Sequence, residues 1–202
     1  MRQLLAIVVV SLFSLIACGS DPLDDCVKDS NGTLDCSGAE LNNVDLSGRN
    51  LRNVDLFGTL YGTDLSQANL SGVDLSFNYL KDTDFSGANL EGVDFSGAIL
   101  ERVDFSGASL SGANLYAAHG GGQNFSGADL SGANLYGTDY LTWDFTGAKA
   151  DNETVWPDEF DPEAAGVIFK QDPVTRPPLL WSNWHPHLTG RVVWPTSLGV
   201  SD

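Results

Sequence analysis

The chain has 202 residues, of which 42 % are apolar and 18 % are charged, and its formal net charge is −17. This length leaves room for one domain with appendages rather than for several domains. Only ten Lys and Arg residues are present, scattered along the chain, which argues against a basic binding groove.

The start of the chain, residues 1–17, has the pattern of an export signal. Arg2 supplies one positive charge, and a predominantly apolar run follows from Leu4 to Ala17. A run of this length is too short to span a membrane as a helix and suits the hydrophobic part of a cleaved signal. We therefore expect residues 1–17 to be a signal peptide.

The signal ends in Leu15-Ile16-Ala17-Cys18, which resembles the lipobox of bacterial lipoproteins. The resemblance implies cleavage before Cys18, attachment of diacylglycerol and palmitate-type acyl chains to Cys18, and tethering to the membrane of the bacterial cell envelope. Gly19 in place of Asp resembles the default for the outer membrane, on its periplasmic or surface face. The alternative is an ordinary secretory signal whose cleavage site includes a cysteine.

Residues 18–33 are expected to form a tether and an N-terminal cap. Without Cys18, the remaining Cys26 and Cys36 make an even pair in an oxidising compartment, which predicts a disulfide. Asn31-Gly32 between them favours a tight turn, so we expect a short hairpin that covers the first coil. A metal-binding loop is the alternative for this Asp-rich segment, but its acids do not match the calcium-loop spacing. No metal site is predicted.

A large apolar residue returns at every fifth position between Thr63 and Ala148. In the series that runs from Leu65 to Phe145 in steps of five, only Gly120 is not bulky. A small residue, often Ala, lies two positions before each centre, Asp or Asn lies one before it, and Ser-Gly usually follows. A period of five fits neither a helix nor a strand. It fits a chain that turns a corner with every repeat, so that four short sides close one square coil.

The pattern resembles the pentapeptide-repeat family over residues 34–150. That resemblance implies an all-β fold, a right-handed quadrilateral β-helix that forms a single solenoid domain. The central and small residues would point inward, and the Asp, Asn, Ser and Gly positions would face water. Side chains four repeats apart should then stack in columns, one of which would contain Leu65, Phe85, Phe105, Phe125 and Phe145.

Two irregularities interrupt the repeat. The spacing between the centres Leu56 and Leu65 is one position shorter than two repeats, so we expect Leu60 to be a centre after a short side and Thr59–Thr63 to be irregular. At the second, Gly120 is the inward centre, so the core should lose a bulky side chain. His119-Gly120-Gly121-Gly122 resembles the oxyanion loop of some esterases, but the required Gly-x-Ser-x-Gly nucleophile motif is absent. No catalytic residue and no cofactor are predicted.

Residues 151–202 differ in composition and are expected to be a C-terminal cap and a Pro/Trp-rich tail. They hold four of the five Trp and seven of the eight Pro residues. Asp161, Pro162 and Gly166 suit the start and end of one helical turn, which would cover the last coil. Farther on, His185 and His187 offer two imidazoles without a third ligand at a recognisable spacing.

Two outward surfaces are candidates for function. The first is a column of acidic and amide side chains on one side of the square: Asp64, Asp84, Asp104, Asn124 and Asp144. We interpret it as a solvated face favoured by corner geometry. The alternative is an anionic rod that imitates a nucleic-acid backbone, as proposed for family members that bind DNA gyrase, although export argues against it.

The second surface is an apolar patch at positions that elsewhere hold Ser, Gly, Asp or Asn: Phe77, Tyr79, Ile99, Tyr116, Tyr136 and Leu141. A contiguous apolar patch indicates an interaction site or a segment that covers it. One interpretation is that the chain's own Trp-rich tail packs there. The other is docking of a partner protein or a glycan on the aromatic rings.

The sequence therefore predicts a non-enzymatic, membrane-anchored pentapeptide-repeat lipoprotein that acts as a binding or structural module in the bacterial cell envelope. Its expected partners are the membrane, through the lipid anchor, and an envelope protein or glycan, whereas nucleic acid is not favoured. The alternatives are an acidic DNA mimic that binds a type II topoisomerase and an envelope glycan-binding protein.

Overall fold

The fold is seen in a computed structural model that describes residues 21–170. Within this range the chain forms no helix, and therefore none that could cross a membrane. Its strands are very short: β1 (Val27–Lys28), β2 (Leu34–Asp35), β3 (Val54–Asp55), β4 (Thr59–Tyr61), β5 (Tyr79–Lys81), β6 (Ile99–Glu101), β7 (Lys149–Ala150) and β8 (Ile168–Phe169).

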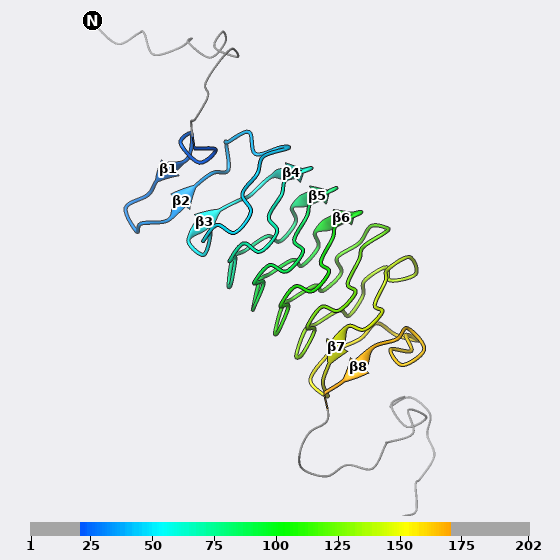
Figure 1. Cartoon of the computed structure of the whole chain (residues 1–202). Helices are drawn as coiled ribbons and strands as arrows, with labels where there is room; N and C mark the ends of the chain where they lie inside the picture. The colour runs from blue at the N-terminus through cyan, green and yellow to red at the C-terminus, as the bar shows by residue number, and fades with distance from the viewer. Residues whose placement is uncertain (1–20, 171–202) are drawn as a thin grey trace, which may run out of the picture. The chain divides into compact units, whose positions relative to one another are not determined.

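The described chain winds as a right-handed quadrilateral β-helix. Strands β4, β5 and β6 pair in parallel with Leu60 opposite Leu80 and Leu80 opposite Leu100, so one coil takes four repeats. The same register recurs in isolated bridges on the other sides, as from Asp84 to Asp104 and from Asn69 to Asn89. Figure 1 shows β4, β5 and β6 one below another in successive coils. The predicted coil length and fold class are confirmed.

The interior is filled by the fifth-position side chains and by the small residues two positions before them. Leu65, Leu70 and Leu75 have no exposed surface, and Ala68 between them has none either. The predicted phenylalanine column is present, with ring centroids 5.4 Å apart from Phe85 to Phe105 and 4.8 Å apart from Phe105 to Phe125. Burying each such ring removes a large apolar surface from water, and the stack of coils adds these contributions together.

Most corners are hydrogen-bonded turns. The N–H of Ala88 donates to the carbonyl of Phe85 at 3.0 Å, and the N–H of Ala108 donates to that of Phe105 at 3.0 Å. The residue before the donor takes a positive φ, as at Gly107 with 64°, a conformation that glycine adopts without steric cost. The Ser-Gly step of the repeat is thus explained by the geometry of the turn.

The one-residue deletion expected between Leu56 and Leu65 is confirmed, but the expectation that Thr59–Thr63 is irregular is wrong, because Thr59–Tyr61 forms β4 and pairs regularly with β5. Leu60 is a buried centre. Asp45 pairs with Asp64 and Asn50 with Asn69, so the sequence separation between paired residues is one less here than in a regular coil. One residue is therefore missing from a single side of the square. The ladder returns to the regular register at β4.

Buried polar side chains donate hydrogen bonds to several backbone carbonyls of the core. The repeat pattern alone does not predict these bonds. Thr63 Oγ1 donates to the Leu41 carbonyl at 2.7 Å, and the Thr83 hydroxyl donates to the Leu60 carbonyl. Both threonines occupy the small inward position and are buried. An unpaired carbonyl in the core would be costly, so these hydroxyls stabilise the coil where its backbone turns inward.

The coil around Gly120 differs from the prediction that the core would lose a bulky side chain there. A Cβ on Gly120 would collide with the carbonyl oxygen of Leu100, so only glycine fits, and its φ is 130°. Two inward positions that hold small residues in most repeats carry large residues here, and these side chains fill the space. The Gln123 amide donates to the Leu100 carbonyl, and Trp143 Nε1 donates to the Gly120 carbonyl at 3.3 Å. Trp143 is 8 % exposed and stacks on the core.

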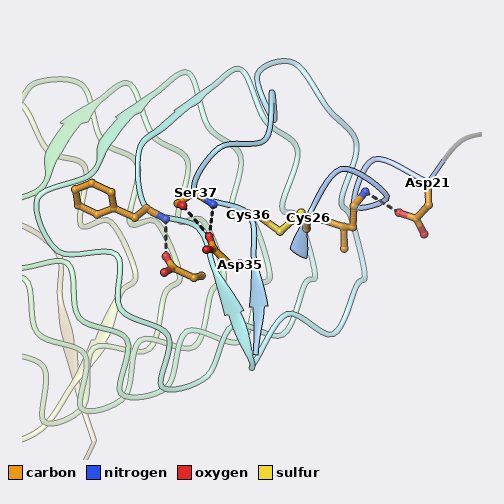
Figure 2. The surroundings of a disulfide bond; sticks show 8 residues. Asp21, Cys26, Asp35, Cys36 and Ser37 are labelled. Atoms are coloured by element: carbon orange, nitrogen blue, oxygen red, sulfur yellow. Dashed lines mark hydrogen bonds between the residues drawn. A yellow bond between two sulfur atoms is a disulfide. The ribbon is translucent and has the colours of Figure 1, made fainter. Parts of the chain in front are cut away.

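The N-terminal cap has the predicted form. Strands β1 and β2 make an antiparallel hairpin, with Val27 opposite Asp35, and β2 pairs in parallel with β3. A disulfide joins Cys26 to Cys36, as predicted, and Cys36 is buried in the core. Figure 2 shows this bond between the hairpin and the first coil, with Asp21 close by. The hairpin thus covers the open end of the first coil and protects its strand edges.

The C-terminal end continues farther than the predicted boundary at residue 150. Asn134 pairs with Val155, and β7 pairs in parallel with β8, so the ladder extends to Phe169. As predicted, Asp161 caps a single turn, and its Oδ1 accepts the N–H of Ala164 at 3.0 Å. The ring of Phe160 packs on Phe145 at 5.1 Å and covers the end of the core. The expected extended tail, with Trp181, Trp184, His185 and His187, lies outside the described residues.

Candidate binding surfaces

The acidic column is built as predicted, and its side chains have a structural role. The bridges run from Asp64 through Asp84, Asp104 and Asn124 to Asp144. Each Oδ1 accepts the backbone N–H two residues later, at 2.7 Å for Asp84 and 3.0 Å for Asn124. This hydrogen bond closes the corner, which explains why Asp and Asn recur there.

At two corners the same kind of local bond favours the ionised form of the carboxyl group. Hydrogen bonds from the hydroxyl and N–H of Thr146 lower the pKa of Asp144, and those from Ser47 lower the pKa of Asp45. The anionic surface is therefore a by-product of turns that need an acceptor at this position.

One pair of charged residues clamps two coils together. Arg102 Nε and Nη2 each donate to a different oxygen of Asp82, both at 2.7 Å. The guanidinium lowers the pKa of the Asp82 carboxyl. Both residues take positive φ values, 51° each, at corner positions where glycine is usual.

Four exposed aromatic residues gather on one corner of the prism, and we call this surface the aromatic corner: Phe57, Phe77, Tyr116 and Tyr136. They are 61 %, 74 %, 50 % and 44 % exposed, respectively. Backbone bonds place the last three along one corner, because the N–H of Phe77 donates to Ser96, that of Gly97 to Tyr116, and that of Ala117 to Tyr136. Tyr116 and Tyr136 lie in successive coils, and the coil of Ser96 and Gly97 lies between Phe77 and Tyr116. The aromatic corner therefore runs along the axis of the β-helix.

Phe77 occupies the most unusual position of the aromatic corner. Its φ is 57°, a left-handed value at a place where most coils have glycine. Its ring lies over Gly97, where an added Cβ would be 2.7 Å from the ring. A bulky residue in this conformation is strained, and such strain is found most often at functional positions.

Tyr116 and Tyr136 form the C-terminal half of the aromatic corner. Their rings stack with centroids 6.3 Å apart and planes inclined by 17°. The Tyr136 hydroxyl donates to Asp158 Oδ2 at 3.4 Å. This contact links the aromatic corner to the chain that covers the last coil.

The predicted patch is thus only partly one surface. Tyr79 and Ile99 are half-buried in β5 and β6, on the adjoining side, and the Tyr79 hydroxyl donates to Glu101 Oε2 at 3.1 Å. Leu141 is 82 % exposed but belongs to the next corner by register, in the column of Tyr61 and Lys81. Phe57 was missed because the one-residue deletion before Leu60 shifts the columns that precede it. Tyr61 was missed although it lies in the regular register, opposite Lys81.

The remaining candidates contribute little in the described part of the chain. Within residues 21–170, no three His, Cys, Asp or Glu side chains are placed to hold a metal ion. His119, from the glycine-rich stretch, is exposed, and its ring lies 3.4 Å from the carbonyl of Ala117. Cys18, the predicted lipidation site, lies outside the described residues.

Comparison with known proteins agrees with this architecture. The family model of pentapeptide repeats matches the chain in 8 copies, at residues 60–97, 79–115 and 98–139. The pentapeptide repeat protein Rfr23 from the cyanobacterium Cyanothece 51142 is 30 % identical, with 60 % of this chain and 90 % of that one covered and a TM-score of 0.33. No curated protein matches the sequence.

Two further solved pentapeptide-repeat structures match this chain. The pentapeptide repeat protein alr5209 from Nostoc PCC 7120 is 34 % identical, with 55 % of this chain and 84 % of that one covered and a TM-score of 0.22. QnrB1, a plasmid-mediated fluoroquinolone resistance protein, is 20 % identical over 64 % of this chain and 81 % of its own, with a TM-score of 0.31. The chain belongs to the pentapeptide-repeat family, whose members are generally non-enzymatic structural or binding proteins.

Proposed function

We propose that this protein is a non-enzymatic binding module that lipidated Cys18 tethers to the membrane of the bacterial cell envelope, with the outer membrane favoured. The sequence Leu15-Ile16-Ala17-Cys18 after an apolar run is the observation that carries the anchor. Asp21, where the described body begins, follows Cys18 closely, and a stretch this short spans about 10 Å at most. The body is thereby held close to the membrane surface.

The aromatic corner is the surface that we assign to the binding of an envelope protein or glycan. Its four rings are exposed along one corner, and aromatic residues dominate the energetics of interfaces. The strained Phe77 supports this assignment, because neither the turn nor the core requires a ring there. The acidic column needs no second function, since its carboxylates close the turns of the coil.

The anchor is tested by metabolic labelling with radioactive palmitate and by fractionation of the envelope. We expect wild-type protein to incorporate label and to remain with the membrane. Cys18→Ala should lose both properties, whereas Ser20→Ala, which retains the cysteine, should lose neither. A Cys18→Ala variant that stays membrane-bound would contradict the anchor.

The binding surface is tested by affinity capture from detergent-solubilised envelope and by co-sedimentation with purified cell-wall glycan. The test variant carries Phe77→Ser, Tyr116→Ser and Tyr136→Ser, and the control is Leu141→Ser, an exposed apolar residue on another corner. Loss of capture in the triple variant alone supports the aromatic corner. Equal capture by wild type and triple variant would exclude it.

The alternative interpretation, that the chain's own tail covers the aromatic corner, has a separate readout. A chain that ends at residue 170 should bind more of a hydrophobic fluorescent dye than the full chain if the tail lies on these rings. Unchanged dye fluorescence would show that the aromatic corner is free for a partner.

A further inference from the structure

We propose that a hollow between the N-terminal cap and the coil of residues 50–54 binds a phosphate group. The hollow has a volume of about 580 Å³, and its polar lining consists of Lys28, Asn50, Arg52 and Asn53. Leu34 and Val54 add an apolar wall, and Gly32 completes the lining without any carboxylate. In a chain with a net charge of −17, two cations that face one hollow free of acids are unexpected.

The fold sets the relative positions of these side chains. Lys28 belongs to β1, which pairs with β2, and Leu34 of β2 pairs in parallel with Val54 of β3. The Leu34 N–H donates to the Asn53 carbonyl at 2.8 Å, so the hairpin lies directly against the corner that carries Arg52. The Cys26–Cys36 disulfide holds this hairpin on the coil. The hollow is therefore a product of the cap and does not recur along the repeat.

Neither cation is used by the fold. In residues 21–170, four other cations form ion pairs: Arg49 with Asp21, Lys81 with Glu101, Arg102 with Asp82 and Lys170 with Asp129. Within the same range, Lys28 and Arg52 form no ion pair with an acidic side chain, and both are exposed. Their charges are available to a ligand.

The carboxylates close to Lys28 and Arg52 in the sequence already accept hydrogen bonds from backbone N–H groups. Asp29 Oδ1, next to Lys28, accepts the N–H groups of Asn31 and Thr33, both at 2.8 Å. Asp55 lines the adjoining hollow together with Arg52, and its Oδ1 accepts the Phe57 N–H at 3.0 Å. Asp74 lies in that second hollow as well, so an anion is expected only on the cap side of Arg52.

The donors fit phosphate chemistry. A guanidinium presents paired N–H groups to two phosphate oxygens, and an ammonium adds a compact charge. The amides of Asn50 and Asn53 can donate to further oxygens, while Leu34 and Val54 can contact the carbon side of a phosphate ester. The site is open to solvent, so the expected affinity is modest and falls with salt.

The headgroup of a membrane phospholipid is the source that we favour, and this part of the proposal rests on the proposed anchor at Cys18. Asp21 is bonded to Arg49 Nη1 at 2.6 Å, and Arg49 precedes Asn50 of the hollow. The anchor, which lies just before Asp21 in the sequence, can therefore bring the hollow to the headgroup layer. Binding there would orient the prism relative to the membrane.

The test uses the chain from residue 18 onward with Cys18→Ser, which retains the whole described body and carries no lipid. Inorganic phosphate is titrated at low salt and followed by NMR shifts of backbone amides around the hollow. Flotation measures binding to vesicles of phosphatidylglycerol with phosphatidylethanolamine, and to vesicles of phosphatidylcholine alone. The variants are Lys28→Gln and Arg52→Gln, and the control is Lys149→Gln, an exposed cation on β7 with the same loss of charge.

Each cation variant should weaken phosphate binding by about fivefold, the factor for one charge at contact distance in water. If both also lose binding to anionic vesicles while Lys149→Gln does not, the lipid source is supported. If only phosphate binding weakens, the anion site stands and the lipid source is overturned. No phosphate binding by the parent chain, or an equal loss in Lys149→Gln, overturns the proposal. The phosphate measurement does not depend on lipidation, so it remains valid if the anchor fails its own test.

Discussion

The interior and the corners of this prism obey the same five-residue repeat but tolerate departures from it very differently. Inside, every change of size is compensated nearby, as when Trp143 fills the space beside Gly120. At the corners, Phe77 and Arg102 replace glycine at a left-handed backbone position, and their side chains are exposed rather than packed in the core. Close packing constrains the interior, whereas a corner side chain has only its backbone conformation to satisfy. New functions are therefore expected to arise at the corners.

The largest effect should come from emptying the interior. Phe105 contacts Phe85, Phe95 and Phe125 with ring centroids 5.4, 5.5 and 4.8 Å away, respectively. Phe105→Ala should lower the free energy of unfolding by about 3 to 5 kcal/mol, measured by urea unfolding. The control Phe57→Ala, at the exposed aromatic corner, should change it by less than about 0.5 kcal/mol. Similar losses for both variants would refute the contrast between interior and corner.

Gly120→Ala should be the next most damaging change. The new Cβ would collide with the Leu100 carbonyl in the neighbouring coil, and the φ of 130° excludes other residues. Overpacking and backbone strain together should cost about 3 kcal/mol. Gly107→Ala, with a φ of 64° and open space around it, should cost only about 1 to 2 kcal/mol. Thermal unfolding of the two variants measures the difference, and equal costs would show that the coil can shift.

A smaller effect of opposite sign is expected at Phe77. Phe77→Gly removes a bulky residue from a φ of 57° and should raise the free energy of unfolding by about 1 kcal/mol. The same variant should weaken binding at the aromatic corner. Gln67→Gly, at the same φ of 57° but away from the aromatic corner, is the control that should gain stability without losing binding. A destabilised Phe77→Gly variant would mean that the ring contributes to the fold.

The smallest effect concerns pH and the clamp between two coils. Arg102 lowers the pKa of Asp82 below its usual value of 3.8, so the clamp stabilises the fold above that value. Its contribution is lost as the pH falls through the lowered value in the folded protein. Urea midpoints measured between neutral pH and pH ~3 should fall less steeply for Asp82→Asn than for wild type. If the urea midpoints of the two proteins fall equally with pH, the other carboxylates account for the acid sensitivity.

The sequence was sufficient to predict features that depend on spacing. The four-sided coil, the buried Leu60 after a short side and the Cys26–Cys36 disulfide all follow from counting positions. The apolar columns were predictable for the same reason, because every buried centre occupies an equivalent place in the square.

Features that depend on backbone direction were not predictable from the repeat. Counting positions cannot show that the carbonyls of Leu41 and Leu60 turn inward, although Thr at 63 and 83 in place of Ala was an available signal. The aromatic patch was predicted only in part, since Phe57 precedes β4, where the regular register is restored. The hollow at the cap was missed because Lys28 and Arg52 are distant in the sequence and meet only through the pairing of β2 with β3.

The acidic columns separate the shape of the protein from its charge. In successive coils, Asp104 accepts the N–H of Ser106 at 2.8 Å and Asn124 accepts the equivalent N–H of Ser126 at 3.0 Å. The turn therefore requires an oxygen at this position but not a negative charge. Exchanging Asp for Asn along a column could change the electrostatic character of one face while the prism remains the same. A protein built in this way can be adapted to the charge of its surroundings without redesign of its core.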